Sequence, residues 1–165
     1  MMNWALAQTE HPVIIRVPVA PLRSLGLEVD DDYSDLNTYQ LVRSGSGTAI
    51  VAAGNMLSAA LEAAEILEAE GIRPTVINPR FLSGIDEEML SSLSEDHTAV
   101  LTVEDAILDG GMGQKIASFF GDRPMLVRNL GLPKIFIDGY KASELADKYH
   151  LTARGIAQQV REMFK

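Results

Sequence analysis

Two adjacent carboxylates, Glu104 and Asp105, could carry out acid–base chemistry in this chain of 165 residues. They follow the apolar run 98–103, which is typical of a buried strand. Carboxylates at the end of a strand can transfer protons or hold a metal ion. The alternative is structural, because the same side chains can accept hydrogen bonds from the loop or from the next helix N-terminus. Arg80, which follows an earlier strand, could pair with Glu104 across the top of the sheet, and that pair would also be structural.

A glycine-rich segment, Gly110-Gly111-Met112-Gly113, stands just before a predicted helix. The main-chain N–H groups of such a segment can bind an anion at a helix N-terminus, so Gly110, Gly111 and Gly113 are candidate anion-binding residues. The segment is not a P-loop, because no Gly-Lys-Ser/Thr follows, and it lacks the full Gly-x-Gly-x-x-Gly fingerprint. The alternative is that the glycines serve only a tight turn and close helix–sheet packing.

Other kinds of catalytic or metal site have no support in the sequence. The chain has no cysteine, which excludes disulfides, thiolate metal sites and thiol nucleophiles. His11, His97 and His150 do not have the spacing of metal ligands, so a structural role is expected for each. No Gly-x-Ser-x-Gly nucleophile elbow is present. We therefore predict no catalytic residue and no metal ligand in this chain.

Strands and helices alternate along the chain from residue 39 onward. The hydrophobic pattern predicts strands at 39–43, 48–53, 73–77, 98–103 and 125–129, and helices at 56–70, 86–93, about 113–120, 142–149 and 153–164. This alternation predicts a three-layer α/β/α sandwich around a five-stranded, mixed but mostly parallel sheet, with the short first strand as an antiparallel edge. The loops that follow the parallel strands would then meet at one edge of the sheet, where α/β proteins bind ligands.

The first 37 residues have a different pattern. Residues 1–10 have a helical composition, and the β-branched run 13–17 predicts a buried strand that Pro18 ends. Residues 19–37 are rich in Asp and read as a linker. We therefore predict a short helix–strand segment at 1–18, a linker at 19–37 and the main domain at 38–165.

Composition and charge restrict the classes of partner. The chain is 47% hydrophobic with a mean hydropathy of +0.07, which is enough for a sizeable core. It has 14 Lys and Arg against 23 Asp and Glu, a net charge of −9, and no basic run that could follow a nucleic acid backbone. It shows neither a signal peptide nor an apolar run of about 20 residues. We expect a cytoplasmic protein that binds neither nucleic acid nor membranes.

Several segments, taken in order, resemble the C-terminal domain of transketolase-like thiamine diphosphate enzymes. They are Gly47-Thr48, Leu61-Glu62-Ala63-Ala64, Asn78-Pro79-Arg80-Phe81 with Asp86, Thr102-Val103-Glu104-Asp105, Gly110-Gly111-Met112-Gly113, and Asn129-Leu130-Gly131-Leu132-Pro133 with Phe136-Ile137. Within this group, the segments 129–133 and 149–156 are most similar to the deoxyxylulose phosphate synthases. The resemblance covers nearly the whole chain: residues 1–18 resemble the end of the preceding pyrimidine-binding domain, and 38–165 the complete C-terminal domain.

The resemblance implies a parent transferase that uses thiamine diphosphate and magnesium. Such an enzyme decarboxylates pyruvate and joins the remaining unit to glyceraldehyde 3-phosphate in the isoprenoid precursor pathway. The cofactor-binding domains of these enzymes match nothing here, so the resemblance implies no cofactor in this chain. In the synthases, a second arginine that follows the strand of Arg16 is implicated in holding the substrate phosphate. Here Val19 stands in its place, so Arg16 is a candidate substrate residue and Arg23 a possible substitute.

Two functions from different classes follow. The chain is the C-terminal part of a deoxyxylulose phosphate synthase and is inactive by itself, or it is a freestanding assembly or anion-binding module that docks onto separate thiamine-domain chains. For the isolated chain we expect a homodimer, because the family forms two-fold assemblies. Trp4, Leu6 and Val13 to Val17 would expose an apolar surface that favours contact with another chain.

Overall fold

The computed structural model describes residues 1–18, 25–26 and 32–164. The chain divides into two compact units, Met1–Leu36 and Asn37–Lys165, and each unit is described by itself. Most of the predicted linker at 19–37 lies outside the described residues. The larger unit contains the candidate chemical residues of the sequence analysis except Arg16 and Arg23, and Arg23, like Val19, lies outside the described residues.

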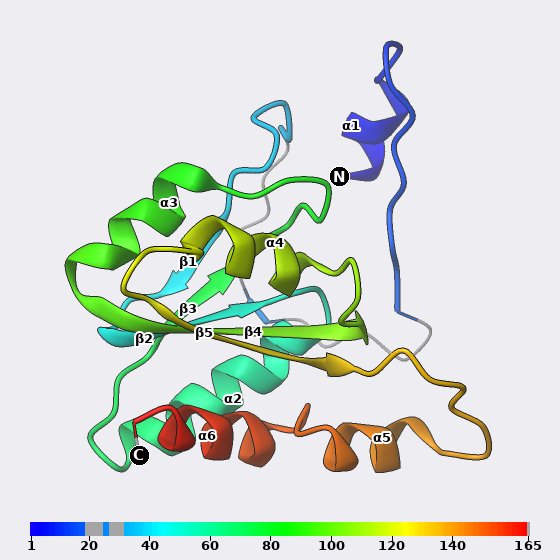
Figure 1. Ribbon diagram of the computed structural model, residues 1–165. Helices are drawn as coiled ribbons and strands as arrows, with labels where there is room; N and C mark the ends of the chain where they lie inside the picture. Colours follow the sequence, from blue (N-terminus) through cyan, green and yellow to red (C-terminus); the bar gives the residue numbers. More distant parts are fainter. Residues whose placement is uncertain (19–24, 27–31, 165) are drawn as a thin grey trace. The chain divides into compact units, whose positions relative to one another are not determined.

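A five-stranded sheet forms the middle of the larger unit (Figure 1). Its strands are β1 (Gln40–Arg43), β2 (Gly47–Ala52), β3 (Thr75–Asn78), β4 (His97–Ile107) and β5 (Leu126–Leu132), in the order β1-β3-β2-β4-β5. Strands β2 to β5 pair in parallel, whereas β1 runs antiparallel to β3 at one edge. The predicted mixed sheet with an antiparallel first strand is therefore confirmed, although β1 pairs with β3 and not with its neighbour in sequence.

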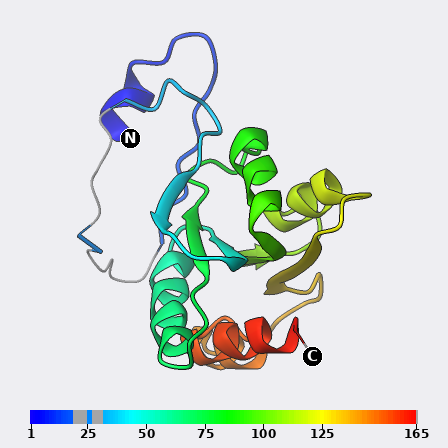
Figure 2. The ribbon, with the colours of Figure 1, turned by 90° about the vertical axis from the view of Figure 1, so that its left-hand side faces the viewer.

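Helices cover both faces of this sheet, as predicted. Helices α3 (Glu87–Ser92) and α4 (Met112–Phe120) lie on one face, and α2 (Met56–Glu68), α5 (Ala142–Lys148) and α6 (Ala153–Glu162) lie on the other (Figures 1 and 2). A short 3₁₀ turn, Leu93–Glu95, leads into β4. The three-layer α/β/α arrangement explains why β2 and β4 are almost continuously apolar, since a strand covered on both faces has no solvent side.

The core lies on both sides of the central strands. Ala49, Val51, Ile77 and Val100 pack with Leu90, Ile116 and Phe120 under α3 and α4. The alternate residues of the same strands, including Ile50 and Leu101, are also fully buried. Tyr39 belongs to the first cluster, and burial raises the pKa of its hydroxyl.

Helix termini follow their sequence signals. Gly71 adopts a φ of 82° just beyond α2, where the Ile72 N–H donates to the Leu67 carbonyl over 3.0 Å, so glycine ends this helix as expected. The Thr152 side chain accepts a hydrogen bond from the Gly155 N–H and caps α6, also as expected. An exposed ion pair between Arg161 and Glu70, 2.6 Å long, connects α6 with α2, and its hydrogen bond lowers the pKa of Glu70.

Asp86 joins the start of α3 to the start of β1. Its Oδ1 accepts the Met89 N–H over 2.9 Å as an N-cap, and its Oδ2 accepts the Tyr39 N–H over 2.8 Å. We expect Asp86→Ala to lower the free energy of unfolding by about 2 kcal/mol, since it removes both a cap and a cross-chain hydrogen bond. Urea denaturation followed by circular dichroism would measure it. Asp122→Ala, in an exposed loop, is the control, and an equal loss in both variants would contradict the assigned role of Asp86.

The smaller unit contains a helix and no strand among its described residues. Helix α1 spans Met2–Leu6, and the ring of Trp4 lies 6.1 Å from that of Tyr33. The prediction of a buried strand at 13–17 is wrong, because no strand forms there and the side chains of Ile14 and Val17 are 89% and 73% exposed. A β-branched run favours an extended backbone, but a strand also needs a neighbour that satisfies its main-chain groups and covers its side chains. No helix in the described parts of the chain is long and apolar enough to cross a bilayer.

Candidate functional site

Glu104 follows Val103, where the pairing of β4 with β5 shifts register, and it lies under the N-terminus of α4. Its side chain is buried. Its Oε2 accepts the Met112 N–H over 3.1 Å and its Oε1 accepts the Gly113 N–H over 3.0 Å. A carboxylate at a helix N-terminus satisfies main-chain donors that otherwise lack partners and interacts favourably with the helix dipole. The structural alternative considered from the sequence therefore describes the observed contacts of Glu104.

The Gly110–Gly113 segment uses all of its N–H groups within the chain. Besides the two bonds to Glu104, the Gly110 N–H donates to Gln114 Oε1 over 2.7 Å, and the Gly111 N–H donates to the Leu108 carbonyl over 3.0 Å. An external anion at this helix N-terminus would have to displace the carboxylate of Glu104. The role of Gly110, Gly111 and Gly113 as anion ligands remains a prediction, and the geometry gives it no free donor.

Two of these glycines are required by close packing. A Cβ atom at Gly111 would lie 2.5 Å from Oε1 of Glu104, and one at Gly113 would lie 2.5 Å from Oγ1 of Thr102. Thr102 Oγ1 in turn donates to Asn129 Oδ1 over 2.8 Å, joining β4 to β5. The polar strip under α4 therefore consists of the buried Glu104 and Thr102 and the half-buried Asn129, and Glu104 is the ionisable member of the three.

Asp105 and Asn55 show that two of the strand-end loops meet at one edge of the sheet, as expected. The Asn55 amide donates to Asp105 Oδ2 over 3.1 Å, and both side chains are exposed. This contact links the loop after β2 to the end of β4. Asp105 thus points to solvent and to the neighbouring loop, whereas Glu104 points into the protein, so the two carboxylates do not form a pair that could share a proton.

Arg80 lies at the third strand-end loop and does not reach Glu104. Its Nε and Nη2 donate to the Thr38 carbonyl over 3.1 and 2.9 Å, and its φ is 55°. The Arg80–Glu104 pair that the sequence allowed does not form, for two reasons. Strand β2 separates β3 from β4, and both oxygens of Glu104 already accept N–H groups of α4. Arg16 lies in the smaller unit with an exposed side chain, and its role remains a prediction.

An open groove of about 620 Å³ runs between the loop before α3 and one side of α4. Glu87 and Lys115 are the charged residues that line it, beside Ile85 and Phe119. Lys115 Nζ donates to the carbonyls of Leu82 and Ser83 over 2.7 and 3.1 Å, so its amine ties the loop to the helix. Among the described residues no group of three His, Asp or Glu side chains could hold a metal ion.

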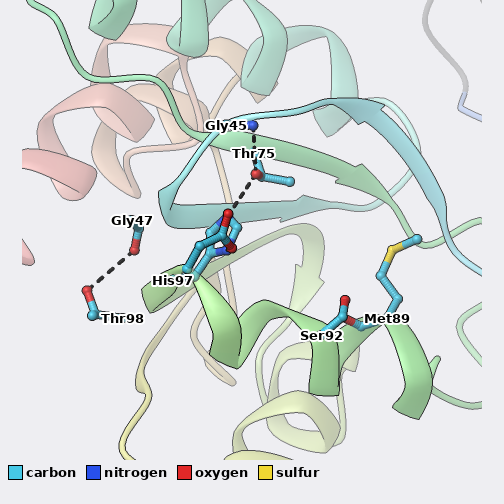
Figure 3. A network of polar contacts seen from close by, with 8 residues as sticks. Gly45, Gly47, Thr75, Met89, Ser92, His97 and Thr98 are labelled. Atoms are coloured by element: carbon cyan, nitrogen blue, oxygen red, sulfur yellow. Dashed lines mark hydrogen bonds and ion pairs between the residues drawn. The ribbon is translucent and has the colours of Figure 1, made fainter.

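His97 belongs to a polar network at the opposite, amino end of the sheet (Figure 3). Its Nε2 lies 2.8 Å from Thr75 Oγ1, which accepts the Gly45 N–H over 3.0 Å, and its Nδ1 lies 2.5 Å from Asp96 Oδ1. His97 Nδ1 approaches Asp96 without making a hydrogen bond, so Asp96, His97 and Thr75 do not form the hydrogen-bonded relay that activates a hydroxyl nucleophile. Thr75 and His97 are both buried and Thr75 already binds Gly45, so the network holds the loop before β2 and exposes no nucleophile.

Comparison with known proteins shows which family the chain resembles. A family model described as the C-terminal domain of transketolase matches residues 37–156. The 1-deoxy-D-xylulose-5-phosphate synthase of Geobacillus thermodenitrificans is 34% identical over 166 residues, covering 98% of this chain and 26% of that protein. The synthase of Chlorobium luteolum is 32% identical over 167 residues, covering 100% of this chain and 26% of its own length. The chain thus spans about a quarter of the length of these relatives.

Solved structures agree with this match. A chain described as a split gene transketolase, in an inactive beta4 tetramer, superposes with a TM-score of 0.73 at 31% identity, covering 87% of this chain and 46% of that one. A transketolase from Pichia stipitis has a TM-score of 0.54 at 22% identity over 76% of this chain and 18% of its own, and supports the fold alone.

Proposed function

The chain belongs to the transketolase C-terminal domain family, and we propose that it is the C-terminal domain of a thiamine-diphosphate-dependent 1-deoxy-D-xylulose-5-phosphate synthase. The observation that carries the proposal is the match to synthases along nearly the whole chain, at 34% and 32% identity. The reaction joins pyruvate, after loss of carbon dioxide, to glyceraldehyde 3-phosphate, and the working protein is cytoplasmic.

The described residues do not fit thiamine diphosphate or its magnesium ion. A diphosphate needs main-chain or cationic donors, and the N–H groups of the Gly110–Gly113 segment all donate within the chain. A magnesium ion needs oxygen ligands that converge, whereas Glu104 and Asp105 point apart. In the proposed synthase the cofactor therefore binds to other domains, where it supplies the electron sink.

We propose that this chain has a structural role in the synthase, which is to hold the loops at one edge of its sheet in fixed positions. Glu104 fixes the first turn of α4 on β4, Thr102 and Asn129 fix β5 beside it, and the Asn55–Asp105 contact fixes the loop after β2. The result is a sheet edge whose loops are held by hydrogen bonds. A rigid edge of this kind can position a neighbouring domain without touching the reacting atoms.

The alternative is that the chain docks as a separate polypeptide onto thiamine-binding chains. It is favoured by the likeness to a transketolase that is encoded by a split gene. The anion-binding version of this alternative has less support, because an anion would have to compete with Glu104 for the start of α4. In both versions we propose that the isolated chain forms a homodimer.

A chimera tests the proposed function. The Geobacillus thermodenitrificans synthase would be truncated by its last quarter and fused to this chain, and formation of 1-deoxy-D-xylulose 5-phosphate would be measured. We expect the truncated enzyme to be inactive and the fusion to recover activity. The same enzyme cut and rejoined to its own last quarter is the control, and adding this chain as a separate polypeptide tests the docking alternative. A fusion that folds and binds cofactor but stays as inactive as the truncation would contradict the proposal.

The chain by itself should neither bind thiamine diphosphate nor release carbon dioxide from pyruvate. The sequence contains no Gly-Asp-Gly motif with a downstream Asn, the pattern with which the family binds magnesium diphosphate. Titration calorimetry with cofactor and magnesium, with the intact Geobacillus synthase as positive control, would measure binding. A dissociation constant in the micromolar range for the isolated chain would contradict the assignment of a supporting role.

A further inference from the structure

Two aspartates in the chain are followed directly by glycine, in the pairs Asp109–Gly110 and Asp138–Gly139. At such a pair the main-chain nitrogen of the glycine can attack the side chain of the aspartate, because glycine has no Cβ atom to hinder the approach. The sequence does not distinguish the two pairs, since both have the same residue types. Their surroundings in the structure differ, and the difference decides which pair can react.

The reaction rearranges the main chain without any oxidation or reduction. The glycine nitrogen bonds to Cγ of the aspartate, and one carboxyl oxygen leaves as water with two protons, one from that nitrogen and one from solvent. The product is a five-membered succinimide ring. Water then adds to one of the two ring carbonyls and breaks its bond to the nitrogen. Opening at the main-chain carbonyl gives isoaspartate, in which the chain runs through Cβ and Cγ and the carboxylate stands on Cα.

The groups of Asp109–Gly110 that would have to react are held by neighbours. The Gly110 N–H donates to Gln114 Oε1 over 2.7 Å, and Asp109 Oδ2 lies 3.9 Å from Lys134 Nζ. The preceding residue, Leu108, donates its N–H to the end of β5 over 2.9 Å. Closing the ring here requires release of the Gly110 N–H and rotation of the carboxylate away from the lysine, in a loop fixed to the sheet at its start.

Asp138 and Gly139 lie in the connection from β5 to α5, which Figure 1 shows in orange. Both residues are exposed, and within the described part of the chain no hydrogen bond or ion pair engages the Asp138 carboxylate or the Gly139 N–H. Gly139 has a φ of 75°, in the left-handed region that favours glycine. The turn therefore places glycine after the aspartate and leaves both reacting groups open to solvent.

We propose that Asp138–Gly139 is the site at which this chain forms isoaspartate, and that the contacts of Asp109–Gly110 prevent the same reaction there. The modification adds one carbon atom to the main chain and moves the carboxylate closer to it. Strand β5 ends at Leu132 and α5 begins at Ala142, so the change falls between two elements and should leave the sheet intact. The modified Asp138 would be a substrate for an enzyme that methylates the carboxylate of isoaspartate.

The contacts set the expected difference in rate between the two pairs. At Asp109 the loop has to open before the ring can close, so the rate falls with the fraction of time in which the Gly110 N–H is released. We expect its hydrogen bond and the adjoining strand pairing to reduce that fraction at least about 10-fold. Urea removes these contacts, so the two pairs should react at similar rates in the unfolded chain.

Peptide analysis of the full chain tests the proposal. Samples would be kept at neutral pH and physiological temperature, with and without urea, and digested after exchange into buffer. Trypsin cleaves after Lys and Arg and places the two pairs in separate peptides, 135–141 and 81–115. Isoaspartate is recognised by altered retention at unchanged mass, and by methylation with an isoaspartate methyltransferase and S-adenosylmethionine. In the native chain we expect Asp138 to convert at least about 10-fold faster than Asp109.

Two variants test the reason for the difference. Asp138→Glu keeps the charge but would need a less readily formed six-membered ring, so the isoaspartate signal should disappear from peptide 135–141. Gln114→Ala removes the acceptor of the Gly110 N–H and should speed conversion of Asp109 at least about three-fold. Gln114 and Asp138 are both exposed, so both variants should fold, which circular dichroism would verify.

The remaining outcomes would each overturn the proposal. Equal native rates at the two pairs, or faster conversion of Asp109, would show that the described contacts do not control the reaction. Conversion of Asp138 in urea but not in the native chain would show that the connection from β5 to α5 is held in folded protein. An unchanged rate at Asp109 in Gln114→Ala would refute the assigned cause of its protection.

Discussion

Glu104→Ala is expected to lower the free energy of unfolding by about 3 kcal/mol. The carboxylate is 4% exposed, and it accepts the N–H groups of Met112 and Gly113, which are themselves buried. Removing it leaves two buried donors without partners, each costing about 1–3 kcal/mol, together with a cavity under Gly111. The energy released by no longer burying a carboxylate offsets part of this loss.

The size of the effect should depend on charge as well as shape. Glu104→Gln keeps the volume, but its amide offers one acceptor oxygen and turns an NH₂ group toward the second donor. We expect a loss of about 2 kcal/mol for this variant, since hydrogen bonds to charged groups are worth about 1.5–3 kcal/mol. Asp105→Ala is the matched control, because Asp105 is the adjacent, exposed carboxylate, and its loss should stay below about 1 kcal/mol.

Urea denaturation of the three variants distinguishes a structural from a chemical role for Glu104. If Glu104→Ala is no less stable than Asp105→Ala, the carboxylate does not hold α4. The acid–base alternative raised by the sequence would then regain support. If the ranking is as expected, any loss of activity of Glu104→Gln in the synthase chimera should disappear under conditions that restore its folding, such as lower temperature.

The sheet was predictable because its central strands are covered on both faces. The run Thr48–Ala53 and the run Thr98–Val103 are apolar at nearly every position, and they form β2 and β4. The run Val13–Val17 is also apolar and β-branched, apart from Arg16, and forms no strand. Local composition is therefore sufficient only where the rest of the fold supplies a partner strand. The pairing of β1 with β3 was likewise not evident from the short spacing between β1 and β2.

The sequence predicted which residues form the candidate site but not what each of them does there. Glu104 and the glycines were identified from type and position, and both a chemical and a structural role were consistent with the sequence. Which role applies depends on whether the carboxylate points into the protein or out of it. Successive side chains along a strand point in opposite directions, so a shift of one residue reverses the answer. Glu104 and Asp105 illustrate the rule, since one is buried under α4 and the other is exposed.

The sequence did not predict which individual side chains from distant segments contact one another. Gly45, Thr75 and His97 lie in three separate segments, and nothing in the residue types near them indicates that they meet. His97 was expected to be structural because it lacks metal-ligand spacing. That argument does not indicate which residues the His97 ring contacts. The network in Figure 3 is therefore a product of the sheet order, which places the starts of β3 and β4 on either side of β2.

Gly45→Ala is expected to destabilise the domain by about 3 kcal/mol or more. A Cβ atom at Gly45 would lie 2.1 Å from the carbonyl oxygen of Arg73 and 2.4 Å from the carbonyl carbon of Pro74. Both are main-chain atoms, so no side-chain rotation can relieve the overlap, and the loop before β2 has to move. Its movement breaks the hydrogen bond from the Gly45 N–H to Thr75 Oγ1 and the 2.8 Å bond from the Ser46 N–H to the Arg73 carbonyl.

Ser46→Ala is the control for this prediction, because Ser46 is the exposed neighbour in the same loop and its substitution should change stability by less than about 0.5 kcal/mol. The variants would be compared by urea denaturation, and the histidine ring signals of His97 would be followed by NMR as a local readout. We expect those signals to shift in Gly45→Ala, since Thr75 Oγ1 links Gly45 to His97 Nε2. A variant as stable as the parent, with unchanged His97 signals, would show that the loop does not pack against β3 as closely as described. A destabilised variant with unchanged signals would place the damage elsewhere and would also contradict the prediction.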